Sequence, residues 1–99
     1  MTIYEVHMYK RKEAWYRLSE KEQKELGSKL AKLPTAAGAK SILDLRRAMS
    51  GEWHTFGVYE YPDIETREKL MELYEEQQFF RYVEPLFVLG RAPSERREA

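Results

Sequence analysis

Three side chains capable of acid–base chemistry alternate along the first apolar stretch of the sequence. Glu5, His7 and Tyr9 lie two residues apart, and side chains at this spacing share one face of a β-strand. A carboxylate beside an imidazole can orient the ring and raise its basicity, which is the usual arrangement for a general base. His7 is therefore a candidate base, with Glu5 as its orienting partner and Tyr9 as a substrate-binding group.

The second histidine adds a further catalytic candidate. His54 lies near the start of the stretch WHTFGVYEY, which is dense in aromatic and β-branched residues and predicts a strand. Phe56 and Glu60 follow at even spacing, so they share its face. If this strand lies beside the first, His54 meets His7, while Phe56 and Glu60 become substrate-binding candidates.

A metal site is one alternative use of these groups. Two histidines, His7 and His54, with the carboxylates of Glu5 and Glu60 would form a ligand set known for zinc or non-haem iron. No compact H-x-x-x-H or H-x-H spacing supports it, so we expect neither a metal nor another cofactor. In a second alternative, the polar groups pair with one another in a purely structural network.

Hydrophobic periodicity and turn signals predict the elements that position these side chains. Strands are expected over 2–9, 40–49, 53–61 and 86–90. Ser19 and Glu22 form a capping box that starts one helix, and Asp63 caps a second. Pro34 and Gly38 should end the first helix. The order β-α-β-β-α-β predicts a ferredoxin-like α+β fold, with both helices on one face of a four-stranded antiparallel sheet.

The faces of the central strands decide where the candidate site lies. Gly57 would allow a helix to approach closely, so we expect Gly57, Tyr59 and Tyr61 under the helices. On the first strand we assign the more apolar set to that side: Tyr4, Val6 and Met8. The uncovered face would then carry the catalytic candidates of both strands.

The strand over 40–49 completes the predicted uncovered face. Asp44 and Arg46 join it as substrate-binding candidates if Leu43 and Leu45 face the helices. The apolar residues among these groups would form an exposed patch, and such patches usually mark an interface. We therefore expect a homodimer closed through this sheet face, with an internal cavity in each subunit.

Composition excludes several classes of function. The chain has 99 residues and no cysteine, which excludes disulfides, thiolate metal sites and a cysteine nucleophile. Lys plus Arg and Asp plus Glu number 17 each, so no net charge attracts nucleic acid or an anionic membrane. No apolar run reaches the ~20 residues that span a bilayer. We expect a cytoplasmic protein with a single domain over 1–91 and a flexible tail over 92–99.

Several motifs carry a resemblance to a known superfamily. They are IYEVHMY at the start, AW..LS..E after the first strand, VYEYPD before the second helix, and the aromatic cluster Phe79, Phe80 and Tyr82. Over about residues 2–91 the chain resembles the dimeric α/β-barrel superfamily, which includes antibiotic biosynthesis monooxygenases, muconolactone isomerase-like and NIPSNAP-type proteins, and is most similar to its small uncharacterised members. The resemblance implies a homodimer with a small-molecule pocket between sheet and helices. It implies no catalytic set, because members use different residues.

Two functions follow as hypotheses. The first is a cofactor-independent monooxygenase, isomerase or cyclase acting on a small aromatic or polyketide-like substrate. The second is a non-catalytic homodimeric binding or structural protein. An open, partly apolar cavity that reaches His7 would favour the enzyme. If His7 and His54 are both enclosed by neighbouring side chains and fully hydrogen-bonded, the structural protein is favoured.

Overall fold

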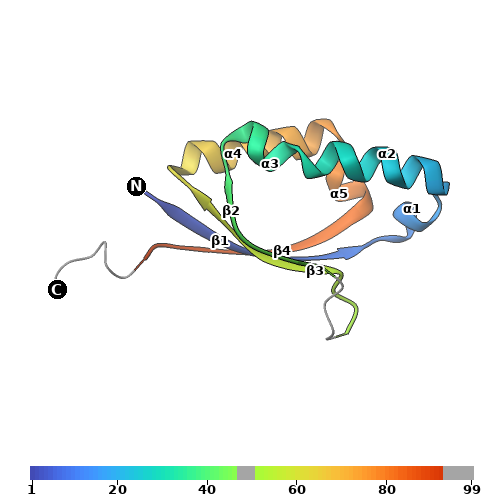
Figure 1. Ribbon diagram of the computed structural model, residues 1–99, viewed down its shortest axis with the longest axis horizontal. Helices are drawn as coiled ribbons and strands as arrows, with labels where there is room; N and C mark the ends of the chain where they lie inside the picture. The colour runs from blue at the N-terminus through green and yellow to red at the C-terminus, as the bar shows by residue number, and fades with distance from the viewer. Residues whose placement is uncertain (47–50, 93–99) are drawn as a thin grey trace.

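All helices lie on one side of a single four-stranded antiparallel sheet. The computed structural model describes residues 1–46 and 51–92. The strands are β1 (Ile3–Arg11), β2 (Lys40–Arg46), β3 (Thr55–Tyr61) and β4 (Val83–Gly90), in the order β2-β3-β1-β4. The helices are α1 (Glu13–Tyr16), α2 (Glu20–Ala31), α3 (Leu33–Ala37), α4 (Ile64–Glu76) and α5 (Phe79–Tyr82). Figure 1 shows the helical layer above the sheet, whose other face is uncovered. The predicted ferredoxin-like βαββαβ fold is confirmed.

The helix boundaries follow the local signals in the sequence. The Ser19 hydroxyl accepts a hydrogen bond from the Glu22 backbone, and the Glu22 carboxylate accepts one from the Ser19 backbone, which completes the capping box. The Asp63 carboxylate accepts from the first turn of α4. Pro34 lies in the first turn of α3, after α2 has ended, and Gly38 terminates α3 with a φ of 107°. These predicted caps are confirmed.

The strands differ in extent from the sequence prediction. Pairing between β1 and β4 runs on to Arg11 and Val83, so both strands are longer than expected. The strand predicted over 40–49 ends at Arg46, and its last predicted residues, with the tail predicted beyond residue 92, lie outside the described residues. The division into a domain over 1–91 and a tail over 92–99 stays a prediction.

The register of β1 overturns the face predicted for that strand. His7 pairs with Gly57 and Glu5 pairs with Tyr59, and directly paired residues share a sheet face. Tyr61 is fully buried in the core under the helices, so the β3 prediction was correct and the β1 prediction was wrong by one residue. The sequence argument placed the more apolar set inside, whereas Glu5 and His7 are the buried side chains, with exposed fractions of 0% and 1%.

The faces of β2 are also the reverse of the assumption made from sequence. Leu43 and Leu45 pair with Val58 and Phe56 on the uncovered face. Asp44 and Arg46 pair with Gly57 and Thr55, so they lie on the helix side. Asp44 and Arg46 therefore do share a face with His7, as predicted, but it is the helix-covered face.

The uncovered face carries two apolar rows that cross all four strands. Following the register, the first row is Leu43, Val58, Val6 and Val88, and the second is Leu45, Phe56, Met8 and Leu86. We call this surface the open face. Several of its side chains are well exposed, among them Val88 at 57% and Leu86 at 46%. Contiguous apolar patches of this kind usually mark an interface.

Glu5 can be buried because two partners satisfy its carboxylate. The Tyr61 hydroxyl donates to one oxygen at 2.7 Å, and the Arg67 Nε–H donates to the other at 2.8 Å. Arg67 lies on α4, and its guanidinium also lies 5.0 Å from the Phe87 ring of β4. A buried carboxylate without such partners would be strongly unfavourable. This ion pair therefore fixes α4 over the centre of the sheet.

We expect Glu5→Gln to lower the free energy of unfolding by about 3 kcal/mol, because it leaves Arg67 without its carboxylate in a largely buried position. Glu13→Gln is the matched control, since the Glu13–Arg17 pair is 74% exposed on both sides and should contribute less than about 0.5 kcal/mol. Urea denaturation of both variants measures the difference. Equal, small losses would contradict the structural role of the buried pair.

Candidate ligand-binding site

A cavity of about 200 Å³ lies between the sheet and the helices. Small side chains explain why it exists, because α2 and α3 contribute Gly27, Ala31 and Thr35 to its wall. Large side chains at these positions would fill the space, as they do in most of a protein interior. The core adjoins the cavity, because Tyr74 of α4 belongs to both, and it continues beyond the cavity to Leu70 and Tyr61.

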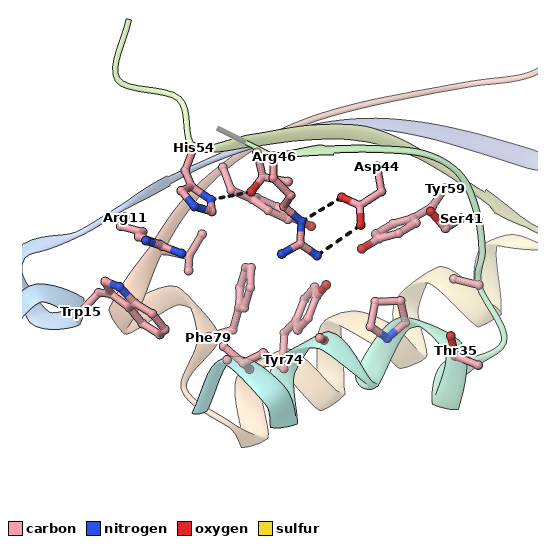
Figure 2. A pocket seen from close by; sticks show the side chains of 18 residues that line it. Arg11, Trp15, Thr35, Ser41, Asp44, Arg46, His54, Tyr59, Tyr74 and Phe79 are labelled. Atoms are coloured by element: carbon pink, nitrogen blue, oxygen red, sulfur yellow. Dashed lines mark hydrogen bonds and ion pairs between the residues drawn. The ribbon is translucent and has the colours of Figure 1, made fainter. Parts of the chain in front are cut away.

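Aromatic rings form much of the remaining wall. They are Tyr9 and Tyr59 from the sheet, Trp15 from α1, Tyr74 from α4 and Phe79 from α5. The Tyr74 and Phe79 rings stack with their centroids 3.9 Å apart. Figure 2 shows these two rings rising from the helical layer toward the sheet. Such a wall suits a flat ligand, because aromatic rings stack on one another with favourable geometry.

Charged side chains gather at the β2 edge of the cavity. The Arg46 Nε–H and Nη2–H donate to the two oxygens of Asp44 at 3.1 and 3.2 Å. Its hydrogen bond with Asp44 raises the pKa of Arg46. At the other end, the Arg11 guanidinium lies 4.9 Å from the Trp15 ring, and Figure 2 shows both side chains beside the cavity. Every residue of β2 is exposed, so this edge is accessible to water.

His54 lies on the same wall as the charged residues. Its Nδ1 is 2.7 Å from the Thr55 hydroxyl, and Figure 2 shows the ring near Arg46. His54 is thus a histidine in direct contact with the cavity, where an imidazole can exchange a proton with a bound molecule.

His7 lies beneath the cavity surface rather than on it. Its ring stacks between Tyr9 and Tyr59, at centroid distances of 4.8 and 4.3 Å. A side chain at Gly57 would meet the His7 ring, with a Cβ only 3.0 Å from Nε2, and the Leu43 carbonyl. Gly57 therefore makes room for His7 and β2, not for a helix as the sequence argument supposed.

Burial determines the ionisation state of His7. Removal from water lowers its pKa to about 4, against an opposing effect of Asp44. The imidazole is therefore neutral at pH 7. Its Nδ1 is buried and has no hydrogen-bond partner among the described residues. Glu5 does not supply one, and the hydrogen bonds of its two oxygens go to Tyr61 and Arg67.

Tyr9 presents a buried hydroxyl on the cavity wall. Burial, followed by the neighbouring Tyr74 and Tyr59 hydroxyls, raises its pKa, so it stays protonated. The Tyr74 hydroxyl lies near enough to act on this pKa as a hydrogen-bonding neighbour, but within the described part of the chain the contact lies outside hydrogen-bond distance and angle, so the Tyr9 oxygen has no hydrogen bond. Buried hydroxyls normally have a partner, so Tyr9 has capacity left for a bound molecule.

The structure brings together half of the residues selected from sequence. The selected residues that line the cavity are Tyr9, Asp44, Arg46 and His54. Glu5 and His7 lie on the same sheet face but are enclosed. Phe56 and Glu60 pair with Met8 and Tyr4, which places them on the open face, away from the cavity. The catalytic roles of His7, Glu5 and His54 stay predictions.

Among the cavity residues that sequence reasoning missed are Arg11, Tyr74 and Phe79. The correct face of β1 would have indicated Arg11, because it continues the even spacing of Glu5, His7 and Tyr9. The two rings were assigned to helical elements, and their position opposite β2 depends on how the helices pack. Local periodicity carries no signal for that position.

The structure offers no converging metal ligands. Among residues 1–46 and 51–92, no three His, Asp or Glu side chains are grouped so that they could hold an ion. The metal ligands considered in the sequence analysis lie on two different faces of the sheet, because Glu60 is on the open face and His7 is on the helix-covered face. No helix in the described parts of the chain is long and apolar enough to cross a membrane.

Solved structures with the same fold include proteins of more than one kind. TA0507, a protein assigned as a chlorite dismutase, matches with a TM-score of 0.68 and 22% identity over 92% of this chain and 45% of its own. A variant of chlorite dismutase from Candidatus Nitrospira defluvii matches with a TM-score of 0.69 and 9% identity over 94% of this chain and 41% of its own. The chain thus spans less than half of either protein.

Two further structural neighbours show that the shared fold does not by itself indicate a function. A protein of unknown function from Rhodopseudomonas palustris matches with a TM-score of 0.62 and 13% identity, over 92% of this chain and 82% of its own. A de novo designed protein matches with a TM-score of 0.55 and 16% identity, over 92% and 97%. No protein-family model matches the sequence, and a search of curated proteins found no match. The likeness establishes the fold, and function must be argued from the cavity.

We expect the His7 imidazole to remain neutral by NMR until the pH falls close to 4. Between that value and the unfolded value of about 6.5, the unfolded chain binds the extra proton, so the free energy of unfolding falls as the pH is lowered through this range, by up to about 3 kcal/mol. His7→Gln should lack this part of the pH dependence while keeping the part due to carboxylates. A His7 resonance that titrates near 6.5 would contradict the buried, neutral state.

Proposed function

We propose that the protein is a homodimeric α/β-barrel protein that binds a small molecule in the cavity between its sheet and helices. The observation that carries the proposal is the cavity itself, which combines aromatic walls with a few polar groups at one edge. Ligand sites in proteins have this composition, with an apolar body and a small number of orienting polar groups. A purely structural protein would have no need to leave this volume unfilled.

The geometry favours a protein that binds its ligand without catalysing a reaction. The cavity does not reach His7, which is neutral at pH 7 and enclosed by tyrosines. The enzymatic form, a cofactor-independent monooxygenase, isomerase or cyclase acting on a small aromatic or polyketide-like substrate, would depend on His54 as the histidine at the cavity wall. Its proton exchange would take place beside Arg46, whose charge stabilises a developing anion.

We expect Ala31→Phe to abolish binding of small aromatic molecules, because the added ring fills the cavity from α2. Ala36→Phe is the matched control, since Ala36 is an exposed alanine of α3 that does not line the cavity. Binding is followed through the indole N–H resonance of Trp15, assigned by comparison with Trp53→Phe. The proposal is contradicted if a panel of phenols, benzamides and aromatic acids leaves the Trp15 resonance unmoved in the wild-type protein.

The open face supports the homodimeric part of the proposal. Its two apolar rows run across the whole width of the sheet, and none of the helices in the described residues covers them. Two copies packed face to face would remove both rows from water, which is favourable by about 25 cal/mol per Å² of apolar surface. The cavities lie on the opposite side of each sheet, so this packing leaves their β2 edge accessible.

We expect Val6→Lys to convert the dimer into a monomer, because it places a charge at the centre of the first apolar row. Ile64→Lys is the control, as Ile64 has nearly the same exposure, 42% against 44%, but begins α4 on the helical layer. Sedimentation velocity reports the mass of each species. A wild-type monomer at micromolar concentration, or a dimer that survives Val6→Lys, would refute this assembly.

A further inference from the structure

We propose that the ligand of this cavity is a monocyclic hydroxyaromatic carboxylic acid, held by Arg46 at its carboxylate and by Tyr9 at its hydroxyl. The inference rests on the proposed function, because it assigns the ligand class of the same cavity. It follows from three separate features of the site, namely its volume, its charge and a buried hydroxyl, that of Tyr9, which has no hydrogen bond among the described residues.

The volume suits a single ring with small substituents. The cavity measures about 200 Å³, and an apolar protein cavity of about 150 Å³ accepts benzene. The stacked pair of Tyr74 and Phe79 and the ring of Trp15 line it. An aromatic ring packs more favourably against these side chains than an aliphatic chain of equal volume, because it can stack on their rings or contact them edge to face.

The charge of the cavity lining favours an anion. Two arginines, Arg46 at the β2 edge and Arg11 at the other end, line the cavity against one acidic residue, Asp44. Within the described residues, Arg46 uses its Nε–H and one Nη2–H on Asp44, so three of the five N–H donors of the guanidinium remain. Its guanidinium projects into the space above Tyr74 and Phe79 (Figure 2). Asp44 therefore holds the arginine in place while leaving donors for a ligand carboxylate, the group that arginine binds best.

Tyr9 provides the second polar contact, at a position set by the strand register. Arg46 pairs with Thr55, and Thr55 pairs with Tyr9, so the two binding residues lie in one row across the sheet. Their backbones are two strand spacings apart, about 10 Å, and both side chains reach toward the cavity. A ring with its acid and hydroxyl on opposite sides suits this arrangement. The buried Tyr9 hydroxyl would then gain the partner that the described residues do not give it.

The test uses 4-hydroxybenzoate as the ligand, with 4-hydroxybenzamide and benzoate as comparisons that lack the charge and the hydroxyl in turn. Isothermal titration calorimetry of the full chain at pH 7 gives the three dissociation constants. We expect the hydroxy acid to bind most tightly. The amide should bind on the order of 10- to 100-fold more weakly, and benzoate about 10-fold more weakly.

Two variants assign these contacts to their residues. Arg46→Gln should weaken the hydroxy acid by at least about 10-fold and leave the amide unchanged, since only the acid uses the charge. Tyr9→Phe should reduce the hydroxy acid to the affinity of benzoate and leave benzoate unchanged. Arg17→Gln is the control for loss of an exposed arginine, because Arg17 pairs with Glu13 on α1, away from the cavity. Near-ultraviolet circular dichroism verifies that each variant is folded.

The outcomes separate this inference from the proposal on which it rests. If neutral aromatics bind as tightly as 4-hydroxybenzoate and Ala31→Phe blocks them all, the cavity binds ligands but the assigned class is overturned. If Arg46→Gln weakens acid and amide equally, the charge contact is overturned. If no member of the panel moves the Trp15 resonance, the proposed function fails together with the inference.

Discussion

The buried contact between Glu5 and Arg67 is the interaction on which the rest of the structure depends. It joins β1 to α4, and the Tyr61 hydroxyl adds β3 to the same network. A carboxylate this deeply buried needs both partners to offset its loss of hydration. Once Glu5 is fixed under the helices, strand alternation places His7 and Tyr9 there as well.

Because Glu5, His7 and Tyr9 lie under the helices, the two faces of the sheet differ in their chemistry. The helix-covered face holds the polar and aromatic side chains, and it encloses the cavity with Tyr9 on its wall and Arg46 at its edge. The open face holds the apolar rows around Val6 and Val58. The proposed assembly and the proposed ligand site would thus use opposite sides of one sheet, so neither would compete with the other for surface.

Local signals in the sequence were sufficient for the fold and insufficient for the faces of two strands, β1 and β2. Capping at Ser19 and Asp63 and the aromatic strand ending at Tyr61 were all predicted, because each depends on neighbours in the chain. The face of β1 was not, because both of its alternating sets contain apolar residues. What decides between them is Arg67, which lies 62 residues from Glu5 along the chain and was not recognised as its partner.

Which candidate residues lie together was likewise predicted only in part, because it depends on the strand faces. Tyr9, Asp44 and Arg46 were selected from sequence and do meet, although on the covered face, since an error of one residue moves an entire strand to the other side. Phe56 was selected with them and lies on the open face. A de novo designed protein shares the fold, and a fold alone implies no function, so a function must rest on the site residues.

A crystal structure of the protein with 4-hydroxybenzoate would locate the ligand relative to both faces of the sheet. We expect the ring between the sheet and α2, with its carboxylate on Arg46 and its hydroxyl on Tyr9. A ligand bound instead against Phe56 and Glu60, on the open face or between two copies, would contradict this expectation and would restore the site first suggested by the sequence.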